Sequence, residues 1–146
     1  MKKIPALLIV FLTLSSCAII QRVAIKNCEF RLAGSVIKEI ALTYLRLGII
    51  IDVTNPNSVD VILDRMRFDL YVNDKKVANA TSNLKTTIPS GASVKITPIV
   101  TLDYGQVGTA LISAIKNMSA NYTLIGTVYF DTPVGTLSFP VTIAKG

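Results

Sequence analysis

The sequence contains no histidine and no tryptophan, and only two of its 146 residues are cysteine. Without histidine the chain cannot form a Ser-His-Asp triad, a Cys-His dyad or a histidine-ligated metal centre. It also lacks the nucleophile-elbow, phosphate-loop and dinucleotide-binding patterns of common enzyme classes. These absences predict a protein that is not an enzyme and that holds no cofactor and no metal ion.

Charge is sparse as well, because charged residues make up only 16% of the chain. Basic residues exceed acidic ones, and the formal net charge is +6 at pH 7. The basic residues are scattered, whereas a nucleic-acid-binding surface needs them gathered in a patch or stripe. We therefore expect no nucleic acid among the partners of this protein.

The N-terminus has the parts of an export signal in the correct order. Lys2 and Lys3 form a positive start, and an apolar stretch follows from Ile4 to Leu14. This stretch is well short of the about 20 apolar residues that cross a hydrocarbon layer. It leads into Leu14-Ser15-Ser16-Cys17, which resembles the bacterial lipobox, whose cysteine is lipidated and becomes the mature N-terminus. The alternatives are a plain secretory signal and a buried N-terminal helix with a chance cysteine.

This interpretation divides the chain into a signal peptide over 1–16, a lipidated cysteine with a short tether over 17–22, and one domain over 23–146. The membrane is then a partner through the lipid on Cys17. Ala18 stands where an Asp would favour inner-membrane retention, so we expect the outer membrane facing the periplasm, or the outer face of the cell membrane in a host with one membrane. Acylation of Cys17 leaves Cys28 without a disulfide partner, and we expect Cys28 to act as a small hydrophobe. A reactive exposed thiol is the alternative.

Alternation of apolar and polar residues dominates the chain after Cys17 and predicts β-strands. Every second residue from Leu45 to Val53 is aliphatic, which defines one buried face of a strand. Pro98 cannot donate to a strand ladder, so its strand is expected at an edge or with a bulge. The predicted strands cover residues 23–32, 43–54, 59–72, 77–84, 93–102, 122–130 and 137–143.

The strand over 59–72 is expected to bury Ile62 together with Met66 and Phe68. It ends at Asn73-Asp74, a pair that tolerates positive φ and suits a tight hairpin. Ile88 to Gly91 is predicted as another turn.

One segment changes period. Between Asp103 and Ser119, apolar residues recur every four positions at Val107, Leu111 and Ile115, which predicts a helix with Asp103 as its N-cap. The whole pattern predicts an all-β fold. This is an immunoglobulin- or fibronectin-III-like antiparallel sandwich of about seven strands, with one helix between the fifth and sixth.

Four segments in order carry a resemblance to a known family. They are Asn55-Pro56-Asn57 after a hydrophobic strand, YVNDKKVA from Tyr71 to Ala78, IPSGASVKI from Ile88 to Ile96, and Leu102-Asp103 opening a helix. Together they resemble the group 2 late embryogenesis abundant (LEA) domain, also called the water stress and hypersensitive response (WHy) domain. The resemblance implies a seven-stranded sandwich with one helix, a link to desiccation and osmotic stress, and no enzymatic activity. Bacterial members are commonly lipoproteins. Asp74 departs from the family, in which Gly is frequent.

Two sets of polar residues have a functional and a structural interpretation. Asn55-Pro56-Asn57 is a turn whose asparagines bind nearby backbone, or else a polar recognition loop. Asp52, Asp60 and Asp64 supply oxygens that suit calcium, but strand alternation interrupts them. We favour turn geometry for the first set and solvated charges at strand ends for the second.

The sequence thus predicts a non-enzymatic, membrane-anchored lipoprotein with a LEA type 2-like domain that protects the envelope under desiccation or osmotic stress by binding or shielding. The alternative is a structural adaptor of an envelope protein complex, since sandwich domains often present a sheet face to a partner. For that role the outward-facing apolar and aromatic residues are the ones to consider: Tyr44, Ile50, Ile125 and Tyr129.

The short tether also predicts an orientation. Because the first strand begins close to Cys17, the strand ends on that side lie near the bilayer. Counting up-and-down strands places the turns at Asn55-Pro56-Asn57, Ile88 to Gly91 and Asp131 to Gly135 on the bilayer side. The Asn73-Asp74 hairpin and the helix are expected at the far end.

Overall fold

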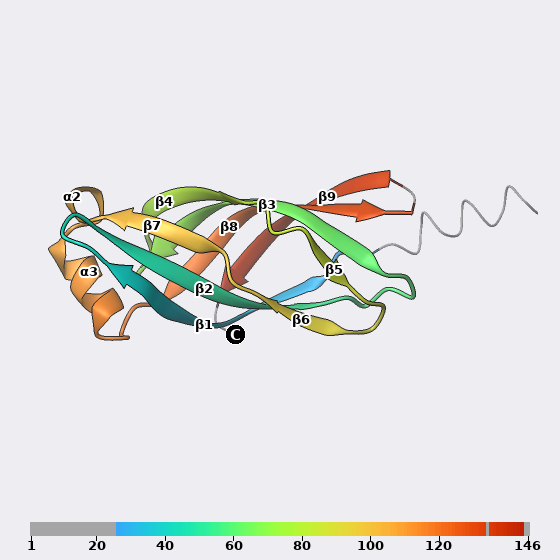
Figure 1. Ribbon diagram of the computed structural model, residues 1–146, viewed down its shortest axis with the longest axis horizontal. Helices are drawn as coiled ribbons and strands as arrows, with labels where there is room; N and C mark the ends of the chain where they lie inside the picture. The colour runs from blue at the N-terminus through green and yellow to red at the C-terminus, as the bar shows by residue number, and fades with distance from the viewer. Residues whose placement is uncertain (1–25, 134, 145–146) are drawn as a thin grey trace, which may run out of the picture.

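The aliphatic residues that alternate from Leu45 to Val53 all lie in the interior and are 0% exposed. Their strand is the centre of one of two antiparallel sheets in the computed structural model, which describes residues 26–133 and 135–144. The two sheets face each other and share one apolar core (Figure 1). The structure therefore confirms the predicted all-β sandwich.

The first sheet has four strands, in the order β1-β2-β6 with β7 also paired to β2. The second has five, in the order β4-β3-β8-β9 with β5 also paired to β3. The strands of the first sheet are β1 (Glu29–Ile40), β2 (Tyr44–Thr54), β6 (Ser93–Ile96) and β7 (Ile99–Asp103). Those of the second are β3 (Val61–Val72), β4 (Lys75–Ser82), β5 (Thr86–Ile88), β8 (Tyr122–Thr132) and β9 (Gly135–Ala144).

Two differences raise the number of strands above the predicted seven. The short strand β5 was not predicted, and the strand expected over 93–102 is divided into β6 and β7. Pro98 explains the division, because it has no N–H for the ladder, although its carbonyl oxygen still accepts from Ile49 N at 3.0 Å. Both pieces pair with β2 alone, which confirms the expected edge position.

The predicted first strand, Val23 to Leu32, is wrong in its bounds. β1 begins at Glu29 and continues to Ile40, and residues 23–25 lie outside the described part. Ala33 and Lys38 are the extra residues at two register shifts against β2. Each bulge reverses the inward and outward positions, so β1 shows no single alternation.

A bulge also corrects the predicted core face of β3. The register against β8 passes from Leu63 directly to Arg65, so Asp64 is the extra residue. Before the bulge Val61 and Leu63 are buried and Ile62 is only half-buried, whereas the prediction placed Ile62 inside. Beyond the bulge the predicted inward residues from Met66 to Val72 are buried as expected.

The predicted helix is broken in two, α2 (Tyr104–Val107) and α3 (Thr109–Lys116), because Gly108 between them has φ 92°. Asp103 is the N-cap, as predicted, and its carboxylate accepts from Gly105 N at 2.8 Å and Gln106 N at 3.3 Å. The break changes which residues face inward. Ile112 is buried, and Leu111, predicted on the core stripe, is only half-buried.

No helix of the described ranges is long and apolar enough to cross a membrane. The sandwich has two distinct ends (Figure 1). The helix end carries α2, α3, the β1–β2 connection and the β3–β4 hairpin, whose turn residues Asn73 and Asp74 have φ 49° and 68°. The asparagine end carries Asn55-Pro56-Asn57, the β5–β6 turn and the β8–β9 hairpin. The predicted distribution of turns between the two ends is confirmed, and which end faces a bilayer stays a prediction.

The outer strands of the two sheets meet along the sides of the sandwich, β1 beside β9 and β4 beside β7. Three of these strands, β1, β4 and β9, are interrupted, and the fourth, β7, is only five residues long. β1 has the bulges at Ala33 and Lys38, and β4 has one at Val77 in its register with β3. Pro140 lies within β9, and Pro98 directly precedes β7. None of these strands therefore offers a long continuous row of free backbone donors and acceptors.

Candidate functional site

Asn55 and Asn57 are the only buried polar residues of the described part, with 0% and 4% of their surface exposed. Asn55 Nδ2 donates to the carbonyl oxygens of Val59 at 2.9 Å and Ile88 at 3.0 Å. Asn55 Oδ1 accepts from both the backbone N and the Nδ2 of Asn57, each at 2.9 Å. The side-chain oxygen and nitrogen of Asn55 are thus both occupied, as burial of an amide requires.

Asn57 binds the start of the described chain. Its Nδ2 donates to Lys26 O at 2.9 Å, and its Oδ1 accepts from Lys26 N at 2.7 Å. This pair of bonds resembles the way one strand holds another. Ser90 Oγ donates to the backbone oxygen of Asn57 at 2.8 Å. The chain therefore enters the domain at a fixed point on the asparagine end.

Further bonds join the same turn to the β5–β6 connection. Asn55 N donates to Ala92 O at 2.9 Å, and Gly91 N donates to Asn55 O at 3.0 Å. Asp60 Oδ1 accepts from Ser90 N at 2.8 Å. We call Asn55, Asn57 and the backbone groups that they bind the asparagine network. It joins three segments, and because its amides are buried and occupied, the structure supports turn geometry over a recognition loop.

The three candidate calcium ligands have different partners and positions in the structure. Asp52 pairs with Lys95 at 2.6 Å, and Asp60 belongs to the contact with Ser90. Asp64 is the bulged residue of β3. No group of three or more His, Cys, Asp or Glu residues that would hold a metal ion occurs within 26–133 and 135–144.

Of the two cysteines, Cys28 is buried and unpaired, with 4% of its surface exposed. Burial raises the pKa of its thiol to about 11, because the thiolate loses its solvation. A thiol that stays protonated at neutral pH is a poor nucleophile, which supports the interpretation of Cys28 as a small hydrophobe. Cys17, the predicted lipidation site, lies outside the described residues.

The four outward residues considered for an adaptor surface do point away from the core, but three are half-covered. Tyr44 donates a hydrogen bond to Glu39 Oε1 at 3.1 Å. Arg65 lies over the ring of Tyr129, with its guanidinium carbon 4.3 Å from the ring centroid. Ile125 is the most exposed of the four, at 45%. They form no continuous apolar patch.

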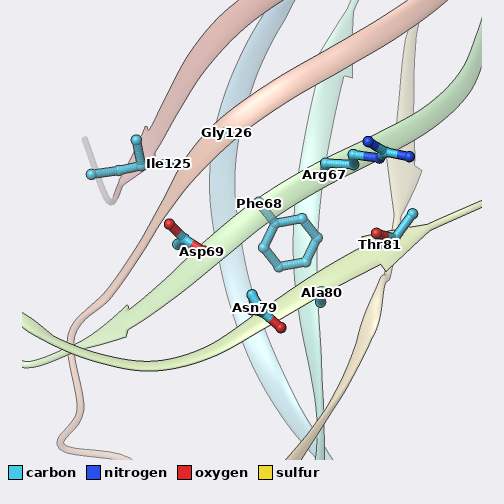
Figure 2. Close-up of a pocket in the computed structure, with 8 residues that line it drawn as sticks. All are labelled: Arg67, Phe68, Asp69, Asn79, Ala80, Thr81, Ile125 and Gly126. Carbon is cyan, nitrogen blue, oxygen red and sulfur yellow. The ribbon is translucent and has the colours of Figure 1, made fainter.

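A depression crosses the outer face of the second sheet (Figure 2). It has a volume of about 450 Å³, and sequence analysis did not find it. Arg67 and Thr81 are paired across β3 and β4, as are Asp69 and Asn79. The depression lies between these two pairs and is bounded by Ile125 on β8. We call it the outer-face trough. Its polar side chains are able to bind a ligand, and the trough holds no nucleophile with an adjacent base.

The family follows from the comparison with known proteins. The family model described as "Late embryogenesis abundant protein" matches residues 51–144, which include the whole second sheet, both helices, β6, β7 and the end of β2. The chain belongs to this family. The comparison of this LEA protein with curated sequences found no significant match.

Solved structures show the same fold. A solution structure from Arabidopsis thaliana covers 82% of this LEA protein and 80% of its own chain, with 16% identity and a TM-score of 0.64. The solution structure of another LEA protein covers 90% and 76%, with 18% identity and a TM-score of 0.57. A crystal structure of an Archaeoglobus fulgidus protein covers 82% and 98%, with 10% identity and a TM-score of 0.51. At these identities the similarity is one of fold.

Proposed function

We propose that this LEA protein is a non-enzymatic lipoprotein of the cell envelope, held at a membrane by a lipid on Cys17, that protects the envelope during desiccation or osmotic stress by binding or shielding. Membership of the LEA family supports the link to stress. The observation that carries the tethered arrangement is the asparagine network, because it fixes Lys26 at one end of the domain.

The length of chain between Cys17 and Lys26 limits the position of the domain. Nine residues reach at most about 30 Å when fully extended. With lipid on Cys17, the asparagine end lies within that distance of the membrane, and we expect the helix end to point away from it. Lys75, Lys76 and Lys116 belong to the helix end. The arrangement therefore gives no role to electrostatic docking of these lysines on lipid headgroups.

The lipid anchor is tested with Cys17→Ser in cells that are fed labelled fatty acid. We expect label in the wild-type protein and none in the variant, which should remain an unprocessed precursor. Cys28→Ala is the matched control and should keep its label. Incorporation of fatty acid into the Cys17→Ser protein would show that Cys17 is not the acylated residue.

The protective role is tested by deleting the gene and restoring either the wild type or Cys17→Ser. After drying or osmotic shock, the deletion strain should lose envelope integrity, measured by dye entry. The wild type should restore it and the unanchored variant should not. A deletion strain with a normal envelope under both stresses would contradict the proposal.

The orientation is tested with spin labels at Ser58, on the asparagine end, and at Lys76, on the helix end. Both are introduced as cysteines in a Cys28→Ala background, and the lipoprotein is reconstituted in vesicles. Collision with a lipid-bound relaxer should be stronger at position 58. Stronger collision at position 76 would refute the arrangement.

An adaptor in an envelope complex is the second candidate, and exposed apolar residues at the helix end favour it. Leu42 is 97% exposed, Met118 69% and Ile40 59%. Ile40 ends β1, and Leu42 lies in the connection between β1 and β2. Under this hypothesis a detergent extract yields a partner in stoichiometric amount, and Leu42→Asp removes it while Leu84→Asp, at another exposed site, does not. Purification as a clean monomer would count against it.

A further inference from the structure

The walls of the outer-face trough carry exposed polar side chains that have no partner in the part of the chain that the structure describes. Within the described ranges, the side chains of Arg67, Asn79 and Thr81 make no hydrogen bond and no ion pair. Arg67 and Thr81 form one cross-strand pair, and Asn79 stands in the next pair along β4. Figure 2 shows Arg67 and Thr81 on one side of Phe68, with Asp69 and Ile125 on the other. Three unused polar side chains thus border a single hollow.

The floor of the trough is backbone. Phe68 pairs with Ala80 on one side and Gly126 on the other, and none of the three directs a large side chain outward. A Cβ at Gly126 would overlap the carbonyl oxygen of Arg67 and the Cα of Phe68, so glycine is required where β8 approaches β3 so closely. The volume of about 450 Å³ falls within the roughly 300–1,000 Å³ of small-molecule sites.

The lining of the trough carries one cation, Arg67, and one carboxylate, Asp69. The carboxylate of Asp69 lies 3.2 Å from Lys76 Nζ, which leaves the guanidinium of Arg67 without a compensating charge. Arg65, two residues before it on the same outer face, stacks on Tyr129, and its buried Nε has no acceptor. Along β3, Asp64 precedes Arg65 and is therefore farther from the trough than Arg65, toward the asparagine end.

A second, larger hollow on the first sheet gives the contrast. It measures about 550 Å³, and its charged residues are two carboxylates and two cations, Glu29, Asp52, Arg31 and Lys95. Asp52 and Lys95 form an ion pair there, and the hydroxyls of Thr54 and Ser93 bond to each other at 2.6 Å. Its charges balance and its polar groups are largely paired, so it does not favour an anion.

These groups define the chemistry of a ligand. A guanidinium binds a carboxylate or a phosphate through two parallel N–H donors. The amide of Asn79 and the hydroxyl of Thr81 are suited to hydroxyl groups, and the exposed side chain of Ile125 offers an apolar contact to the C–H face of a ring. We propose that the outer-face trough binds an anionic sugar, with its carboxylate or phosphate on Arg67 and its hydroxyls on Asn79 and Thr81.

The test uses the full ¹⁵N-labelled chain in a polyoxyethylene detergent, since sugar-headed detergents would compete. Digalacturonate is the carboxylate probe, glucose 6-phosphate is the phosphate probe, and glucose is the neutral control. Amide shifts of Phe68, Ala80 and Gly126 should saturate with one or both anionic probes, and the probe that saturates identifies the anionic group. Saturation with neither probe, or equal shifts with glucose, would overturn the proposal.

Three variants locate the interaction. Arg67→Gln should weaken binding at least tenfold, and Arg67→Lys should weaken it less, because it keeps the charge and loses the two-donor geometry. Arg31→Gln removes a matched arginine on the outer face of the other sheet and should leave binding unchanged. Unchanged binding by Arg67→Gln, with an otherwise native spectrum, would refute the site. The measurement needs no lipid and no stress, so its failure is separate from any failure of the proposed function.

Discussion

Removal of the Asn55 side chain is expected to destabilise the domain more than any other polar substitution on the asparagine end. Asn55→Ala leaves the carbonyl oxygens of Val59 and Ile88 and the backbone N–H of Asn57 without their partners. An unsatisfied buried polar group costs about 1–3 kcal/mol. Water will reach some of these groups at the end of the sandwich, so we expect the free energy of unfolding to fall by about 3–5 kcal/mol. A typical domain has a free energy of unfolding of about 5–15 kcal/mol, so this is a large share of it.

The assay is urea denaturation of the full chain in a non-ionic detergent, followed by circular dichroism. Asn83→Ala is the matched control, because Asn83 is exposed and its side chain has no hydrogen-bond partner within the described ranges. It should change the free energy of unfolding by no more than about 0.5 kcal/mol. Equal midpoints for the two variants would mean that the asparagine network contributes little to stability.

Asn55→Asp separates the hydrogen bonds from the volume of the side chain. The variant keeps an acceptor for Asn57 but turns a carboxylate oxygen toward the carbonyls of Val59 and Ile88. The protonated acid can donate to one of them, so folding favours the protonated form and raises the pKa of the new carboxyl. Stability should therefore increase as pH falls from 7 toward 4. A pH-independent loss would contradict this account.

Other predictions follow from the helices and the buried thiol. Ile112→Ala should cost about 2–5 kcal/mol and Leu111→Ala clearly less, because only Ile112 is fully buried, and denaturation curves in the reverse order would contradict the observed core face. Asp103→Ala should cost about 1 kcal/mol through the lost N-cap, measured in the same way. Met118→Gly should raise the free energy of unfolding by about 1 kcal/mol, since Met118 has φ 59°, and a fall would show that its side chain contributes packing. Because burial raises the pKa of Cys28 to about 11 from 9.0, stability should fall between pH 9 and pH 11, and the Cys28→Ala variant should lack this part of the decline.

Strands with unbroken alternation were predictable from sequence, and interrupted ones were not. β2 is the clearest success, because its buried face runs from Leu45 to Val53 without a bulge. In β1 the bulges at Ala33 and Lys38 reverse the alternation of inward and outward residues twice, and no local sequence rule predicts these bulges. Gly108 is similar, since a glycine can continue a helix or end it. The break that it makes changes the core-facing residue from Leu111 to Ile112.

The candidate sites depend on contacts between residues that are far apart in the sequence, and local sequence patterns do not predict such contacts. The Asn55-Pro56-Asn57 motif indicated a turn. Its asparagines, however, bind residues more than thirty positions away, Asn57 to Lys26 and Asn55 to Ile88. The outer-face trough requires the registers of β3 with β4 and with β8. Arg67, Asn79 and Ile125 look unrelated in the sequence, and only the pairing of three strands brings them together.

The interrupted outer strands have a consequence for a protein crowded on a surface. A lipid anchor confines molecules to two dimensions, and drying brings them closer still. Under such crowding, exposed strand edges pair between molecules and start fibrous aggregates. Here a proline or a bulge occurs at or within every strand along the sides of the sandwich. Under the proposed membrane anchoring, neighbouring copies should therefore not extend each other's sheets readily, and we expect molecules that drying brings together to separate again when water returns.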